Sequence, residues 1–165
     1  MVVERCEQCG FDSDQWTDIE AMTAIGELPV RWRDSVSSLT ADQLHYRPMP
    51  EMWSIAEYVD HVREVLFGMR FVLDTAVTQP GTDLGDPPDT PFDPEPRFVD
   101  IEEALSGIDR EASALGDRLA GLPASAWDSK ATAGNDEMDA HWIARHAVHD
   151  ATHHLLDVDR LREVL

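Results

Sequence analysis

Apolar residues recur at steps of three and four along most of the chain, which is the spacing of helices with one buried face. Four long segments carry this pattern, at about residues 13–39, 55–78, 100–121 and 138–164. No segment shows sustained alternation of apolar and polar residues, so no strand is predicted. The pattern therefore predicts an all-α protein built as a four-helix bundle.

Helix-starting signals support two of these segments. Ser54 is followed three residues later by Glu57, and Asp100 is followed in the same way by Glu103. Such pairs satisfy backbone amides at the first turn of a helix. Pro29 lies inside the first segment. Because proline removes a helical hydrogen bond, we expect it to kink or divide that helix.

Residues 79–99 form a long connection between the second and third helices. It holds six of the ten prolines and several acidic residues. A connection of this length in a compact domain is either functional or a crossover between distant elements. The prediction is a single domain over residues 1–165, with residues 1–12 as an N-terminal extension and a long crossover at residues 79–99.

Charge and hydropathy restrict the partners. The formal net charge is -20, which disfavours binding to nucleic acid or to an anionic membrane. No apolar run approaches the roughly 18 residues that a membrane span needs. The first residues lack the basic and apolar regions of a secretory signal. We therefore expect a cytoplasmic protein that acts on a small molecule, with no nucleic-acid or membrane partner.

The last helical segment is rich in histidine. Four of the seven histidines fall within nine residues, at His146, His149, His153 and His154. At 100° per residue, His154 falls inside the apolar arc of this helix and Asp150, one turn earlier, lies at its margin. His149 and His153 point further towards the polar side. A carboxylate and an imidazole turned inward need a partner, and a divalent metal would provide one.

His61 is the expected third ligand, since it lies beside the apolar stripe of the second helix. Two imidazoles and one carboxylate with an open position form a catalytic zinc arrangement, which also suits nickel, iron or manganese. Asp157 is expected to accept a hydrogen bond from a ligand histidine, to bind substrate or to serve as an alternative ligand. His149 and His153 are supporting or alternative ligands. The alternative is that these histidines bind no metal and are surface residues or hydrogen-bonded core residues.

Cys6 and Cys9 are the only cysteines, and Gly10 follows them. A C-x-x-C pair followed by glycine is typical of half a zinc knuckle, or of a redox pair. A second cysteine pair, which a zinc ribbon requires, is missing, and no βαβ pattern follows for a thioredoxin-like site. A separate metal site, a redox pair and an exposed pair without metal all stay open.

Three stretches resemble the DinB-like metalloprotein superfamily. The segment from Trp53 to His61 is similar to its second-helix signature, and residues 40–48 are similar to the lead-in. Residues 152–158 resemble its last ligand segment, which implies that His154 binds metal with the residue four positions earlier. That residue is Asp150, where the commonest family pattern has histidine. A carboxylate there, with Asp157 three residues after the last ligand, resembles the mycothiol-dependent branch, including maleylpyruvate isomerases.

The resemblance implies a metal-dependent enzyme, with zinc as the first expectation. It would be a transferase or isomerase that uses a low-molecular-weight thiol such as mycothiol or bacillithiol. A metal-dependent hydrolase is an alternative, because the same ligands would activate water. A further alternative is a non-catalytic metal-binding or stress-associated bundle that acts through dimerisation, as a homodimer.

Overall fold

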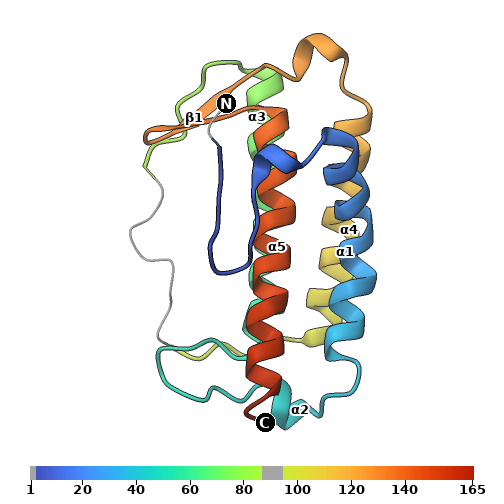
Figure 1. The fold of residues 1–165 in the computed structure, drawn as a ribbon, viewed down its shortest axis with the longest axis vertical. Helices are drawn as coiled ribbons and strands as arrows, with labels where there is room; N and C mark the ends of the chain where they lie inside the picture. The colour runs from blue at the N-terminus through green and yellow to red at the C-terminus, as the bar shows by residue number, and fades with distance from the viewer. Residues whose placement is uncertain (1–2, 87–94) are drawn as a thin grey trace.

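The structure, a computed structural model, describes residues 3–86 and 95–165. Within these ranges the prediction of an all-α four-helix bundle is confirmed (Figure 1). The long helices are α1 (Asp18–Val36), α3 (Ile55–Thr78), α4 (Ile101–Ala120) and α5 (Ala140–Arg162). The shorter elements are η1 (Ser13–Gln15), α2 (Ala41–Leu44), η2 (Ala124–Ala126), β1 (Ala131–Ala133) and β2 (Asp136–Met138).

The predicted capping signals start the helices. Ser54 and Glu57 form a reciprocal capping box on α3, and the Asp100 carboxylate accepts hydrogen bonds from the first amides of α4. The start of α1 was predicted too early, because Thr17 and Glu20 form a capping box there and the preceding residues make the separate 3₁₀ turn η1. Of the two outcomes expected at Pro29, a kink or a division of the first helix, the division does not occur, because α1 runs unbroken from Asp18 to Val36.

The helix α1 continues through Pro29 because tertiary packing outweighs the local cost. Proline leaves the carbonyl of Ile25 without its usual helical donor. On either side of this point, Ile25, Leu28 and Trp32 are completely buried against the other helices. Burying side chains of this size contributes about 1.5–3 kcal/mol each, which offsets the missing hydrogen bond.

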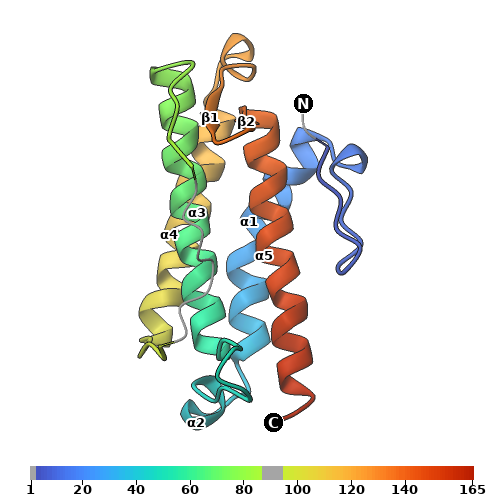
Figure 2. The same cartoon turned by 90° about the vertical axis from the view of Figure 1, so that its left-hand side faces the viewer.

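The helix order explains the long connection. Each helix packs against two others: α1 against α4 and α5, and α3 against α4 and α5. Figure 2 shows that the consecutive helices α3 and α4 lie side by side and run in the same direction. To connect the end of α3 to the start of α4, the chain must therefore cover the length of the bundle in the opposite direction. Since α3 has 24 residues, this distance is about 36 Å, or roughly eleven extended residues.

The described ends of this crossover are anchored at opposite ends of the bundle. After α3, the amide of Leu84 donates to the carbonyl of Thr132 at 2.8 Å, and the Thr132 amide donates to the Thr82 carbonyl at 2.9 Å. Before α4, the amide of Arg97 donates to Glu57 Oε1 at 3.0 Å. The crossover is thus held by β1 at one end and by α3 at the other.

The prediction that strands are absent was wrong for one short hairpin. Strands β1 and β2 have three residues each and pair in antiparallel fashion, with Ala131 opposite Met138. Gly134 forms the turn with φ of 56°, a conformation that glycine adopts without strain. Strands this short carry too few residues to show alternation in the sequence.

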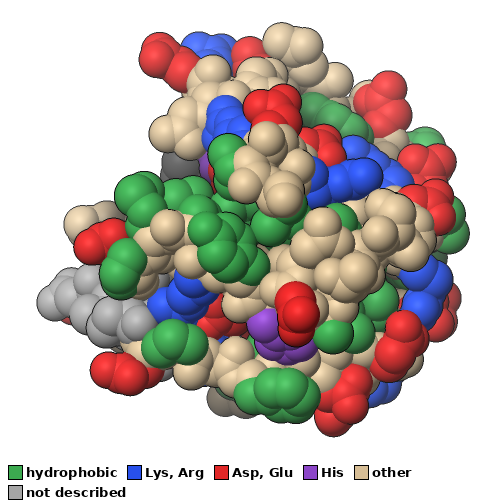
Figure 3. All heavy atoms as spheres, turned by 90° about the horizontal axis from the view of Figure 1, so that it is seen from below, with side chains coloured by type: hydrophobic (Ala, Val, Ile, Leu, Met, Phe, Trp, Pro, Cys, Tyr) green, Lys and Arg blue, Asp and Glu red, His purple; other side chains and the backbone are tan. Residues whose placement is uncertain are grey.

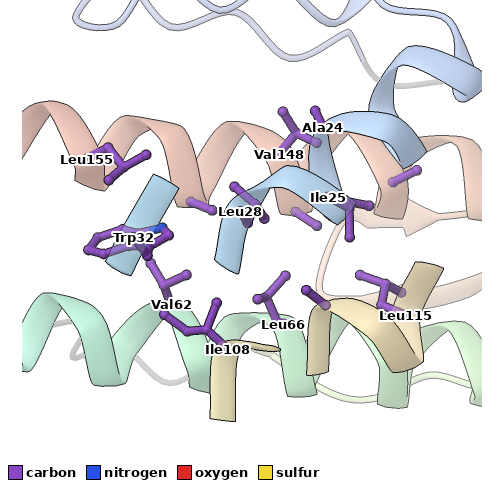
Figure 4. Close-up of a cluster of buried hydrophobic side chains, with 14 of the residues drawn as sticks. Ala24, Ile25, Leu28, Trp32, Val62, Leu66, Ile108, Leu115, Val148 and Leu155 are labelled. Carbon is purple, nitrogen blue, oxygen red and sulfur yellow. The ribbon is translucent and has the colours of Figure 1, made fainter. Parts of the chain in front are cut away.

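The core lies along the bundle axis and is contributed by all four long helices (Figure 4). Its largest completely buried side chains include Ile25, Leu28, Trp32, Leu66, Ile108, Leu115 and Ile143. This continuous core fixes the rotation of each helix about its own axis. That rotation decides which polar side chains of α3 and α5 face each other.

The end of the bundle near α2 and the C-terminus carries exposed hydrophobic side chains. Figure 3 shows hydrophobic side chains gathered over the middle of this end, with acidic side chains mainly around its rim. The exposed apolar residues near this end include Tyr46, Met49 and Phe98. None of the helices in the described ranges is long and apolar enough to span a membrane.

Candidate metal centre

The phase of α5 is set by its buried apolar residues. Ala147, Ala151, Leu155 and Val158 are buried in the core, and they recur at the spacing of one helix face. Asp150 therefore lies at the edge of the core rather than on the open surface. His154, one turn further on, points to the same side of the helix.

The side chains of His61, Asp150 and His154 converge between α3 and α5. Their ligand atoms all lie within 4.8 Å of one another. Asp150 Oδ1 is 3.7 Å from His61 Nε2 and 3.8 Å from His154 Nε2. Helical phase and the family resemblance predicted these three residues as ligands, and the fold brings their side chains together.

Asp150 Oδ1 is buried and has no hydrogen-bond partner among the described residues. A buried carboxylate oxygen without a partner is costly, and a cation between the two imidazoles would satisfy it. Burial, opposed by the charge of Asp150, lowers the pKa of His61. The neutral imidazole, which is the form that binds metal, is thereby favoured.

Aromatic residues surround this cluster. The Trp53 ring lies 4.8 Å from that of His61, and the Tyr58 ring lies 5.1 Å from that of His154, measured between centroids. Burial and the nearby charge of Asp157 raise the pKa of Tyr58 to about 12. Its phenol is therefore protonated at neutral pH and can donate a hydrogen bond.

Asp157 supports the histidines from behind. Its Oδ2 atom lies 3.0 Å from His154 Nδ1 and 3.6 Å from His153 Nε2, and Arg160 donates to its Oδ1 at 3.0 Å. A carboxylate on Nδ1 fixes the imidazole tautomer and leaves the Nε2 of His154 for a ligand. Asp157 thus contacts Nδ1 of His154, whereas Asp150 lies on the side of Nε2.

His149 and His153 lie on the adjoining face of α5 and do not join the His61 cluster. They meet Cys6 and Cys9 instead, and the four ligand atoms lie within 4.8 Å of one another. The amide of Cys9 and the side chain of His149 lower the pKa of the Cys6 thiol to about 6, whereas burial raises the pKa of Cys9. A thiolate is thus favoured at Cys6 at neutral pH.

Glu4 is a site residue that sequence reasoning missed. Its Oε1 atom lies 2.6 Å from His149 Nδ1 and 3.0 Å from His146 Nδ1. Burial lowers the pKa of His149, but Cys6 and Glu4, which flank its ring, raise it overall. No local pattern could reveal Glu4, because 145 positions separate it from His149.

The fold and these clusters define a helical bundle with candidate metal ligands facing each other from α3 and α5. The sequence model of the DinB superfamily matches residues 25–158, and the chain belongs to this superfamily. The matched region begins after the segment that holds Cys6 and Cys9. A comparison with curated proteins found no match.

A solved structure agrees with this assignment at the level of fold. YfiT from Bacillus subtilis superposes with a TM-score of 0.76 at 13% sequence identity, over 97% of this chain and 91% of that one. It is described as a probable metal-dependent hydrolase with an unusual four-helix bundle topology. At this identity the likeness shows the shared fold.

Proposed function

We propose that His61, Asp150 and His154 bind a divalent metal ion, with zinc as the first expectation. The protein would then be an enzyme that activates a low-molecular-weight thiol, such as mycothiol or bacillithiol, for transfer or isomerisation. The observation that carries the proposal is the buried, unpartnered Oδ1 of Asp150, which lies between two imidazole nitrogens.

The spacing of these atoms supports a metal site. Ligands at about 2.0–2.2 Å from a tetrahedral zinc ion are roughly 3.3–3.6 Å apart. The observed separations from Asp150 Oδ1, 3.7 and 3.8 Å, require only a small inward movement. Three protein ligands with one position left open are typical of catalytic zinc sites, whereas structural sites are closed by a fourth ligand.

Access to the site supports a catalytic role as well. The side chains of His61, Asp150 and His154 keep 25%, 21% and 17% of their surface exposed. A small substrate can therefore reach them without unfolding of either helix. A divalent metal at this position would lower the pKa of a bound thiol or polarise an electrophile.

The remaining residues have separate roles in this proposal. Asp157 holds His154 in the tautomer that leaves Nε2 free for binding. Trp53 packs beside His61 and limits the water that reaches this side of the site. Tyr58 is placed to donate a hydrogen bond to a substrate, because its phenol stays protonated at neutral pH. The thiol assignment rests on Asp150 in place of histidine, which resembles the mycothiol-dependent branch.

Metal-dependent hydrolysis is the second candidate. It is favoured by the structural likeness to YfiT, which is described as a probable metal-dependent hydrolase. The same three ligands suit activation of water, so the two candidates differ in the nucleophile and not in the residues that hold the metal.

The test measures metal content and turnover on the same preparations. We expect His61→Ala and Asp150→Ala to contain one equivalent of metal fewer than the wild type by elemental analysis. His141→Ala is the matched control, because His141 lies on α5 but pairs with Asp18. Circular dichroism should show that all variants keep their helices.

Turnover separates the candidate functions. The wild type should conjugate mycothiol or bacillithiol to an electrophilic aromatic substrate, and His61→Ala should lose this activity. Hydrolysis of an activated ester without thiol dependence would favour the hydrolase. Unchanged metal content in both ligand variants, or metal loss only in His149→Ala, would refute the ligand assignment.

A further inference from the structure

The N-terminal segment forms a hairpin that runs beside α5 (Figure 2). The amide of Cys6 donates to the carbonyl of Phe11 at 2.9 Å, and the amide of Gly10 donates to the carbonyl of Cys6 at 2.8 Å. Gly10 adopts φ of 75°, in the left-handed region that glycine tolerates. This tight turn brings the sulfurs of Cys6 and Cys9 to the same side, towards α5.

Two histidines of α5 meet these sulfurs. His149 and His153 are one helical turn apart, so their rings share a face. Cys6 Sγ lies 3.5 Å from His153 Nδ1. With zinc–sulfur bonds of about 2.3 Å and zinc–nitrogen bonds of about 2.0–2.1 Å, a sulfur and a nitrogen on one tetrahedral zinc ion are roughly 3.6 Å apart. The observed separation agrees with a shared metal ion.

His149 provides an independent indication of a missing partner. Its Nδ1 lies 2.6 Å from Glu4 Oε1, so that nitrogen is already engaged. Its Nε2 is buried beside Cys6 and has no partner at good hydrogen-bond geometry among the described residues. The ring is also held in place by Phe11, which stacks on it at 4.5 Å with an interplanar angle of 11°. The orientation of His149 is fixed while one nitrogen is left for a ligand.

Each histidine has a carboxylate near its second ring nitrogen, at hydrogen-bond distance for His149 and at ion-pair distance for His153. Glu4 occupies this position for His149, and Asp157 lies 3.6 Å from Nε2 of His153. Histidines that bind metal usually have such an acceptor on the second ring nitrogen, which orients the ring and makes it more basic. The surroundings of the four side chains therefore fit a single metal site that the hairpin and α5 form together.

We propose that Cys6, Cys9, His149 and His153 bind a zinc ion as a second, structural site, distinct from the cluster at His61. Two thiolates and two imidazoles fill the tetrahedral coordination of zinc and leave no position for substrate. This ion ties the N-terminal hairpin to the last helix. A disulfide between Cys6 and Cys9 would instead leave both histidine nitrogens without a partner.

Cobalt substitution tests the site, because tetrahedral Co²⁺ bound to thiolate has a charge-transfer band in the near ultraviolet. The probe is Co²⁺ alone, added to metal-free protein. We expect the band in the wild type and in His61→Ala, and its loss in the Cys6→Ser/Cys9→Ser double variant. The double variant should lose one equivalent of zinc, from the cysteine site. His61→Ala should also lose one equivalent, from the site at His61, and should keep the zinc bound by the cysteines.

A local structural readout accompanies the metal measurements. Hydrogen exchange in residues 4–13 should become faster in the double variant, while α3 and α5 keep their protection. If the double variant does not fold, His153→Ala is used for the same comparison, since it removes one ligand at a partly buried position of α5. Both variants should release the hairpin without unfolding the bundle.

Three outcomes would overturn the proposal. The first is the absence of a thiolate charge-transfer band in reduced wild-type protein loaded with Co²⁺. The second is unchanged zinc content after removal of both cysteines. The third is a disulfide between Cys6 and Cys9 in protein purified with zinc. Failure of the first proposal would appear separately, as unchanged metal content in His61→Ala.

Discussion

Replacement of Glu57 by glutamine tests how the lead-in to α3 and the crossover are held together. Glu57 is only 1% exposed. Its carboxylate forms an ion pair with Arg47, accepts hydrogen bonds from the amide and hydroxyl of Ser54, and accepts another from the amide of Arg97 at 3.0 Å. One charged group therefore joins the loop before α3, the first turn of α3 and the end of the crossover.

The contribution of Glu57 to the folding free energy follows from the pKa of its carboxyl group. Burial alone would raise it, but Arg47 and the hydrogen bonds from Ser54 and Arg97 lower the pKa of Glu57 from 4.5 to about 2. This difference corresponds to about 3 kcal/mol of folding free energy at neutral pH. Breaking a buried ion pair by removing one partner costs about 3–5 kcal/mol, which agrees.

The sign of the pH dependence follows from the lowered pKa. The contribution is complete above the unfolded-state value of 4.5 and is lost as the pH falls towards 2. We expect Glu57→Gln to reduce the free energy of unfolding by about 3 kcal/mol at pH 7 and by about 2 kcal/mol at pH 3.5. Urea denaturation followed by circular dichroism measures both values.

Glu64→Gln is the matched control on the same helix. Glu64 is 48% exposed and forms ion pairs at 3.4 and 3.6 Å with Arg63 and Arg97. Exposed pairs of this kind contribute about 0–1 kcal/mol. A loss below about 1 kcal/mol in Glu57→Gln at pH 7, or an equal loss at both pH values, would refute the reasoning.

Three further predictions concern the metal centre, a helix start and the core. Asp157→Asn should weaken zinc binding about 10–100-fold in a chelator competition without loss of fold, and unchanged affinity would contradict the role of the carboxylate behind His154. Thr17→Ala removes the capping box of α1 and should cost about 1 kcal/mol in urea denaturation. Leu66→Ala should cost about 2–5 kcal/mol because Leu66 is completely buried. Phe67→Ala, whose side chain is 51% exposed, should cost clearly less, and equal costs would contradict the core assignment.

Periodicity and capping were sufficient to predict the four long helices, apart from the start of α1, because both are local properties of the sequence. The crossover was predicted from its length and its prolines, but the sequence could not say why it is needed. The reason is that α3 and α4 are parallel neighbours, which is a property of the assembled bundle. The hairpin of β1 and β2 was missed because three-residue strands are specified by their partners more than by their own pattern.

The two clusters on α5 differ in how far they could be predicted. Asp150 and His154 share a face by helical phase. His61 was expected from its position beside the apolar stripe of its helix and from the resemblance to the family signature. Cys6 and Cys9 could not be matched with His149 and His153, because the four residues meet only when the two ends of the chain come together. A C-x-x-C pair and an H-x-x-x-H pair can each supply two of the four ligands of a zinc site. The presence of both in one sequence was the signal that could have indicated this cluster.

The distance along the chain between these halves has a consequence for protein synthesis. Cys6 and His153 are separated by 147 positions. At typical rates of about 5–20 residues per second, the cysteines are made roughly 7–30 s before the second histidine. During this interval both thiols are present on a nascent chain that has no α5 against which to pack. The hairpin is translated before the four long helices, but it cannot dock until α5 has been made.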